Sequence, residues 1–283
     1  MDENKGKIVS DVASTADANS PSPTKAPADI IPISVAQYPG RKHWFLRHAA
    51  KFFRAHPCQT LIEPFAGSGI VGLSLLHAGM IERLVLVEKD ERMVCLLRGL
   101  LDDPEIADRY AAFECRRTNV ETLLRTEQSA FRYLVQSRCC NRGKFSGGLR
   151  TTIDERWCRD MVVRNIRRVY AMRDRITVIN GDGLEVMRRY AGNRNVGCFA
   201  DPPYTADTSS KGHLVYRHHR LKHKTLFHLL SGWRGPWLLT EDNSRTIRRL
   251  ALCYRFAYKR VLMNTSDNKK KKELVLWRKR RIS

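Results

Sequence analysis

The sequence has eight cysteines, but no two of them are separated by two intervening residues as in a C-x-x-C motif. Without paired ligand spacing we expect no metal site, and in particular no zinc site. Several cysteines lie in apolar runs, as reduced core cysteines do. No signal peptide is recognisable, so we expect a cytoplasmic protein. No apolar run approaches the length that crosses a bilayer, which argues against a membrane partner.

Acidic residues are also scarce, because 29 Asp and Glu face 51 Lys and Arg, which gives a net charge of +22. Such a charge attracts polyanions, and nucleic acid is the commonest of these. A merely soluble basic protein is the alternative. With 283 residues, of which 42% are hydrophobic, the chain can bury one substantial core with a smaller appended unit. Residues 1–28 have almost no large apolar side chains and are predicted to be disordered.

A short apolar run, Val196–Ala200, ends abruptly in Asp201-Pro202-Pro203-Tyr204. The run predicts a buried strand, and two prolines at its end forbid further ladder bonds and a helix. An acid, a freed backbone carbonyl and an aromatic ring therefore meet in one rigid corner. Together, Asp201 and the Pro202 carbonyl can accept the hydrogens of an exocyclic base amine, while Tyr204 stacks on a flipped-out base. The alternative is an acidic turn punctuated by prolines.

A glycine loop, Pro64–Gly69, follows the predicted strand 59–63 and opens a predicted helix, 70–78. Its glycines allow close approach of a ligand, although the third glycine of the dinucleotide fingerprint is missing. The next predicted strand, 83–87, ends at Glu88, and an acid in this place suits a bond to ribose hydroxyls. For Asp90 we prefer the interpretation of an acid at a helix amino terminus.

Further predicted strands lie at 175–179, 236–240, 256–263 and 273–277, and the tight connection between the last two makes that pair antiparallel. Asp182, after the first of these strands, accepts a bond from an adenine-bearing cofactor or caps the next helix. Three histidines, His218, His219 and His223, lie near the Asp201 corner. Without carboxylate or cysteine company we favour a solvated or phosphate-contacting role for them over a metal.

Residues 101–170 are predicted to be mostly helical and are very basic. A break at 139–148 forms a cationic loop with one aromatic residue, Phe145, suited to phosphate contact or to probing a base, or else an ordinary solvated loop. A long helix, 153–172, carries Trp157, Met161 and other apolar residues on one stripe, which we interpret as core.

The ordered combination of these motifs resembles the Dam-like (alpha group) family of N6-adenine DNA methyltransferases. The resemblance covers about Tyr38 to Trp277 and includes the order of parts: the loop Glu63–Gly69 first, then a helical insertion, then Asp201–Tyr204. It implies a Rossmann-like α/β fold with a seven-stranded mixed sheet whose last strand is antiparallel. Residues 29–100 and 171–283 would form the catalytic domain, and 101–170 a target-recognition insertion.

The resemblance also implies S-adenosylmethionine as methyl donor and duplex DNA as partner, with direct in-line transfer to adenine N6 and no covalent intermediate. It implies the following residues for the donor site: Tyr38, Lys42, Glu63, Phe65, Gly67, Gly69, Glu88 and Asp182. Among these, Phe65, Gly67 and Gly69 would line the methionine moiety, Glu88 would hold the ribose and Asp182 the adenine. Arg41 departs from the family pattern, which usually has a second glycine there.

Residues implied for DNA contact lie in and beside the cationic loop: Asn141, Arg142, Lys144 and Arg150. A cognate restriction enzyme becomes a candidate partner by the same resemblance, whereas the oligomeric state does not follow from it. Two other classes stay open. The Asp201 corner also serves enzymes that methylate adenine in RNA, and the second rival is a non-catalytic nucleic-acid-binding protein on the same scaffold.

Overall fold

The computed structural model describes residues 30–38, 40, 42–143, 145–203, 221–264 and 270–279. Within these residues, seven strands form one sheet, in the order β3-β2-β1-β4-β5-β7-β6. The strands are β1 (Thr60–Glu63), β2 (Arg83–Glu88), β3 (Ile176–Asn180), β4 (Val196–Ala200), β5 (Trp237–Asp242), β6 (Phe256–Asn264) and β7 (Lys270–Arg278). Neighbouring strands from β3 to β5 are parallel, while β7 is antiparallel to both β5 and β6. This is the Rossmann-like methyltransferase topology, so the predicted fold class is confirmed.

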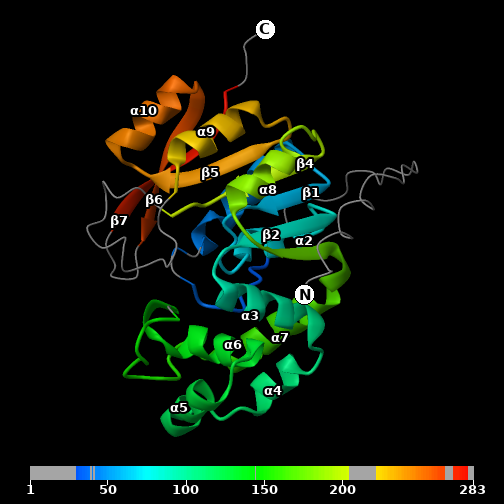
Figure 1. The fold of residues 1–283 in the computed structure, drawn as a ribbon, viewed down its shortest axis with the longest axis vertical. Coiled ribbons are helices and arrows are strands. Elements are labelled where there is room, and N and C mark those ends of the chain that lie inside the picture. Colours follow the sequence, from blue (N-terminus) through cyan, green and yellow to red (C-terminus); the bar gives the residue numbers. More distant parts are fainter. Residues whose placement is uncertain are drawn as a thin grey trace, which may run out of the picture.

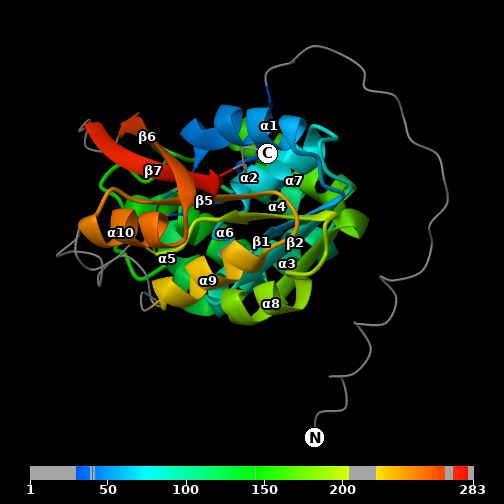
Figure 2. The ribbon, with the colours of Figure 1, turned by 90° about the horizontal axis from the view of Figure 1, so that it is seen from above.

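The helices cover both faces of the sheet (Figure 2). They are α1 (Leu46–Ala55), α2 (Ile70–His77), α3 (Glu91–Asp102), α4 (Ile106–Ala112), α5 (Arg117–Thr126), α6 (Ala130–Cys139), α7 (Arg159–Ala171), α8 (Gly183–Tyr190), α9 (His223–Gly232) and α10 (Arg245–Cys253). Short 3₁₀ turns lie at His43–Phe45, Asn141–Gly143 and Arg173–Arg175. No helix of the described residues is long and apolar enough to span a membrane.

Alternating side chains along each strand divide the interior into two cores. Leu61 of β1 and Phe199 of β4 pack with α1, α2 and α3. Their neighbours Ile62 and Cys198 point to the other face and pack with α8, α9 and α10. A strand that is covered on both faces needs apolar residues at every position. This is why Val196–Ala200 is an unbroken apolar run and is entirely buried.

Helices α4 to α7 form a unit beneath the sheet, with α3 between the two (Figure 1). The unit shares the core of α1 to α3. Gly99 of α3 lies so close to α6 that a Cβ there would be 2.1 Å from the Cβ of Ala130. Within the unit, Tyr110 stacks on Trp157 with 4.0 Å between ring centroids, and its hydroxyl donates to the Trp157 carbonyl at 2.7 Å. The predicted insertion is therefore continuous with the main core.

An irregular segment, residues 30–38, precedes the first helical turn and runs between the helical unit and α2. Its backbone polar groups are bound by buried side chains. The Ile33 amide donates to Ser74 Oγ at 2.9 Å, Asn165 Nδ2 donates to the Ser34 carbonyl at 3.2 Å, and Arg138 donates to Val35. These bonds satisfy backbone amide and carbonyl groups in a segment that belongs to no helix or sheet.

Most predicted element boundaries agree with the structure within two residues, but the long helix was predicted wrongly. Its first turns are absent, because α7 begins at Arg159 and not at residue 153. The Trp157 amide bonds to the Asp154 carbonyl in a turn, and Cys158 takes a left-handed conformation with φ of 45°. Trp157 is therefore a core residue, as expected, but it packs from the turn before the helix. The predicted disordered tail, 1–28, lies outside the described residues.

Candidate active site

The acid after β4 lies at the carboxyl edge of the sheet, where the strand ladder stops. The last register pair of β4 with β5 joins Ala200 to Leu239, and Asp201 follows directly. Its Oδ1 atom lies 2.7 Å from Lys42 Nζ and accepts a 2.7 Å hydrogen bond from the Thr240 hydroxyl. Among the described residues, no polar group bonds its other oxygen, Oδ2. One carboxylate oxygen is thus fixed by the protein, while the second is available to a ligand.

Lys42 is almost fully buried, with 3% of its surface exposed. Besides Asp201, its ammonium group lies 3.8 Å from Glu273 Oε2 and donates to the Gly40 carbonyl at 3.1 Å. Burial lowers the pKa of Lys42, but the carboxylates of Asp201, Glu273 and Glu241 together outweigh this effect, so the net pKa is raised. Lys42 is therefore a permanent buried cation next to Asp201.

Glu63, at the end of β1, is also buried. Its Oε1 accepts a short hydrogen bond from the Gly72 amide in the first turn of α2. Burial raises the pKa of Glu63 to about 8, although the Gly72 bond opposes the shift. At neutral pH this carboxyl therefore carries a proton for most of the time, and it joins β1 to the start of the helix.

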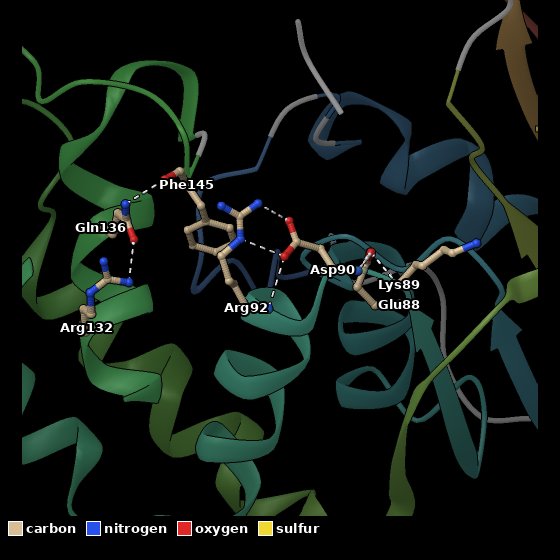
Figure 3. Close-up of polar contacts among 7 residues, drawn as sticks. All are labelled: Glu88, Lys89, Asp90, Arg92, Arg132, Gln136 and Phe145. Atoms are coloured by element: carbon tan, nitrogen blue, oxygen red, sulfur yellow. Dashed lines mark hydrogen bonds and ion pairs between the residues drawn. The ribbon is translucent and has the colours of Figure 1, made fainter. Parts of the chain in front are cut away.

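The glycine loop is held by the carboxylate of Glu88 at the end of β2. Glu88 Oε2 accepts from the Gly67 amide at 2.8 Å, while Oε1 accepts from the amides of Lys89 and Asp90 (Figure 3). Burial raises the pKa of Glu88, and the three amide bonds partly offset that rise. Gly67 has φ of 50°, and a Cβ there would lie 2.9 Å from the ring of Tyr38. Glycine is therefore required where the loop meets this ring.

Asp182 caps helix α8, because its Oδ1 accepts from the Leu184 amide at 2.9 Å. Its Oδ2 lies 3.4 Å from Lys89 Nζ in an exposed ion pair. The structure thus shows the capping role that the sequence suggested, and the adenine contact stays a prediction. Asp90 caps α3 in the same way, as we preferred, and its carboxylate also holds the guanidinium of Arg92.

One pocket brings the predicted donor-binding residues together with the acid corner, the motif that begins at Asp201 after β4. Seven of the eight predicted donor residues line it, and these are Tyr38, Lys42, Glu63, Phe65, Gly67, Glu88 and Asp182. Gly69 is not part of the lining; it precedes α2 with φ of 65°. Asp201 and Pro203 line the same pocket, whereas Pro202 is buried. Tyr204 lies outside the described residues.

Sequence reasoning missed several residues of this site. Ile70, Val71 and Leu221 add apolar lining, while Thr240 and Glu273 hold the Asp201–Lys42 pair. The sequence placed Thr240 at the end of the predicted strand 236–240, but did not indicate its contact with Asp201. Its role depends on the strand order, which places β5 beside β4 and β7 beside β5.

The predicted DNA-contact loop is only partly available to a ligand. Asn141 is exposed, while the Arg142 side chain and Lys144 lie outside the described part of the chain. Arg150 is 9% exposed and donates to the Cys140 carbonyl and to Glu155. It therefore holds the loop together, and its contact with DNA stays a prediction.

Phe145, the aromatic residue of this loop, is also buried, with 8% of its surface exposed. Figure 3 shows why it is buried. The guanidinium of Arg92, fixed by Asp90, lies 5.1 Å from the centre of the Phe145 ring, and Gln136 Nε2 donates to the Phe145 carbonyl at 2.8 Å. An aromatic residue in a polar, glycine-rich loop is thus drawn into the core by its neighbours on α3 and α6.

Of the three histidines, only His223 belongs to the described residues. Its Nε2 lies 3.3 Å from Glu241 Oε1, and Glu241 is fully buried. Burial lowers the pKa of His223, but Glu241 outweighs it and the net pKa is raised. Burial raises the pKa of Glu241 to about 7, with His223 opposing the shift. Among the described residues, no group of three potential ligands could hold a metal ion.

No family model and no curated sequence matches the chain. Several solved structures are similar to it. An rRNA methyltransferase from Streptomyces viridochromogenes has 15% identity, covers 87% of this chain and 89% of its own, and has a TM-score of 0.44. A precorrin 8W decarboxylase from Methanobacterium thermoautotrophicum has 10% identity over 88% and 99%, with a TM-score of 0.42. A putative RNA methyltransferase from Pyrococcus horikoshii has 8% identity over 87% and 92%, with a TM-score of 0.40. At these identities the likeness concerns the general fold alone.

Proposed function

We propose that the protein is an S-adenosylmethionine-dependent methyltransferase that acts on the N6 amine of adenine in nucleic acid, with duplex DNA as its substrate. One observation carries the proposal. The carboxylate of Asp201, after β4, lines the same pocket as Glu88, which ends β2, and Asp182, which closely follows β3 of the same parallel part of the sheet. In an open α/β sheet, ligands bind outside the carboxyl ends of such strands.

The pocket fits the chemical groups of the methyl donor. Glu88 and Asp182 offer carboxylate oxygens to ribose hydroxyls and to an adenine amine. Tyr38 and Phe65 present aromatic rings to a sulfonium cation, and all four residues line the cavity. Bound S-adenosylmethionine supplies an electrophilic methyl group, so the protein needs no nucleophile of its own.

The acid corner supplies what the acceptor amine needs. The lone pair of an exocyclic amine is delocalised into the base, and acceptors on its hydrogens return electron density to the nitrogen. Asp201 Oδ2 is one such acceptor, since Oδ1 is already bound by Lys42 and Thr240. The Pro202 carbonyl, just beyond the last register pair of β4, is the second. Tyr204, the next residue of the motif, is assigned to stacking on the flipped base.

Charge supports a nucleic-acid substrate but does not choose between polymers. The net charge is +22, and the helical unit bears exposed arginines such as Arg116 and Arg167, whose side chains are 73% and 63% exposed. Phosphates of DNA and of RNA attract such residues equally. Charge and pocket groups alone fit RNA as well as DNA, because none of the pocket groups described above distinguishes ribose from deoxyribose. The order of the sequence motifs is what favours DNA.

The test is transfer of labelled methyl from S-adenosylmethionine to unmethylated duplex DNA and to structured RNA, in parallel and in competition. Product nucleosides are then separated. Labelled N6-methyl-2′-deoxyadenosine supports the proposal as stated, and label confined to RNA supports the alternative. If neither polymer is labelled while S-adenosylhomocysteine still binds, the result supports the alternative of a non-catalytic nucleic-acid-binding protein. Label on a carbon or on another base would overturn the assignment to the N6 amine.

A further inference from the structure

A cluster of charged side chains lies buried beneath the acid corner. Glu241 and Asp242 of β5 are fully buried, and Glu273 of β7 is 1% exposed. Asp242 and Glu273 are direct register partners, so two acids face each other across neighbouring strands. Asp201 adds a fourth carboxyl group. Buried like charges cannot all ionise without a cation among them.

His223 and Lys42 are cationic groups that contact this cluster. His223, from α9, pairs with Glu241 at 3.3 Å. Lys42 lies between Asp201 and Glu273, at 2.7 Å from the first and 3.8 Å from the second. Its position makes Lys42 the counter-ion of Asp201.

The contacts of the lysine ammonium also bear on its role. An ammonium group has three donors. The Lys42 ammonium lies 2.7 Å from Asp201 Oδ1, donates to the Gly40 carbonyl at 3.1 Å and lies 3.8 Å from Glu273 Oε2. All three are protein groups, so the charge of Lys42 is engaged before any ligand enters. Thr240 then completes the arrangement by donating to the same Asp201 oxygen.

We infer that Lys42 is a positioning residue: it keeps the carboxylate of Asp201 ionised and oriented toward the substrate amine, instead of contacting the methyl donor. The inference rests on the proposed function and changes the role that the resemblance implied for this residue. Ionised Asp201 accepts a hydrogen bond from the amine, whereas a protonated carboxyl would present a donor on one of its oxygens. Without a nearby cation, the surrounding acids Glu63, Glu241, Asp242 and Glu273 would favour that protonated form.

The experiment compares the pH dependence of methyl transfer in the wild type, K42M and E273Q. In K42M the acidic limb of kcat should move to higher pH by roughly one to three pH units, the scale for loss of an adjacent opposite charge. At a pH on that limb, kcat then falls about tenfold per pH unit. In E273Q the limb should move to lower pH, because Lys42 then serves Asp201 alone. General structural damage would not move the limb in opposite directions.

Two further measurements keep the inference separate from folding and from the proposed function. The fraction of each variant that binds S-adenosylhomocysteine normalises kcat, and the affinity for this probe should change less than about threefold in K42M. A large loss of affinity with an unmoved limb would make Lys42 a donor-binding residue and overturn the inference. K42R, which keeps the charge, should leave the acidic limb closer to its wild-type position than K42M does.

Carbon-13 NMR of labelled aspartate follows the Asp201 carboxyl without any turnover, with D201N identifying the signal. Its titration midpoint should move to higher pH in K42M. If the wild type methylates neither DNA nor RNA but this shift occurs, the proposed function fails and the electrostatic role of Lys42 stands. An unchanged midpoint overturns the inference even in an active enzyme.

Discussion

Replacing Gly183 with alanine should displace the glycine loop of the pocket. Gly183 is the first residue of α8, and a Cβ there would lie 2.0 Å from the carbonyl oxygen of Pro64. Ordinary contact begins near 3.4 Å, so the two backbones must separate by about 1.4 Å. Neither atom is the end of a flexible side chain, and the separation must therefore move the loop or the helix.

The cost follows from the size of that shift. Overpacking of a well-packed site destabilises proteins by about 1–3 kcal/mol, which for a chain of this size corresponds to roughly 2–12 °C in Tm. Pro64 is joined directly to Phe65 and lies near Gly67, whose amide binds Glu88. A misplacement of about 1 Å at a catalytic site can reduce the rate on the order of 100-fold. We expect G183A to lose both stability and affinity for S-adenosylhomocysteine.

Gly181 provides the matched control, because it is two residues away and lines the same pocket. A Cβ at Gly181 meets only Ile179, at an ordinary 3.8 Å, so G181A should keep the wild-type Tm within a degree or two. Differential scanning fluorimetry gives the Tm of both variants, and isothermal titration calorimetry gives the probe affinity. Equal behaviour of the two variants would refute the packing argument. Loss of Tm in G183A with unchanged affinity would show that α8 moves and the loop does not.

Three other predictions follow from the same geometry. D201N should reduce methyl transfer by at least about 100-fold, the scale for a lost transition-state contact, while nucleic-acid affinity in a gel-shift assay stays within a few fold; unchanged turnover would contradict the mechanism. The pKa of Glu63 is about 8 in the folded protein, against an ordinary value of 4.5 in the unfolded chain, so only the folded protein keeps this proton between the two values. Wild-type stability should therefore fall between these values by up to about 1.4 kcal/mol per pH unit, and E63Q should lack this fall in urea titrations, its amide oxygen still accepting from Gly72. Nucleic-acid affinity should drop steeply with salt, roughly 1000-fold between 50 and 200 mM if six phosphates are contacted; a flat response would mean that the net charge is not a binding surface.

Local sequence was sufficient to predict the strands, the glycine loop and the acid corner. Each depends on neighbouring residues: the run 196–200 is apolar because both its faces are covered, and the prolines after Asp201 must end it. The cap at Asp90 was likewise predicted from its place before a helix. Such features are fixed within one or two turns of chain.

The rest depended on tertiary contacts, which the pattern of neighbouring residues does not show. Nothing near Lys42 indicates that its ammonium lies against Asp201, because the pair forms only when the segment before α1 crosses the end of β4. Arg150 and Phe145 lie beside or within a loop that is polar and rich in glycine, a composition typical of exposed loops. Each is buried by a partner elsewhere: Cys140 and Glu155 for the arginine, Arg92 and Gln136 for the ring. Composition describes a loop's own preference, and tertiary packing overrode it here.

The same contacts explain why the helical unit and the pocket belong to one structure. The turn after β2 contacts both the pocket and the helical unit. Glu88 binds the glycine loop, and Asp90, two residues later, binds Arg92, whose guanidinium covers the ring of Phe145 (Figure 3). On the other side, the segment 30–38 is bound by Asn165 and Arg138 of the helical unit and ends at Tyr38, whose ring packs on Gly67. Two sets of direct contacts thus join the predicted nucleic-acid-binding helices to the glycine loop. A displacement of these helices cannot leave the glycine loop unaffected, since interiors packed this closely transmit strain.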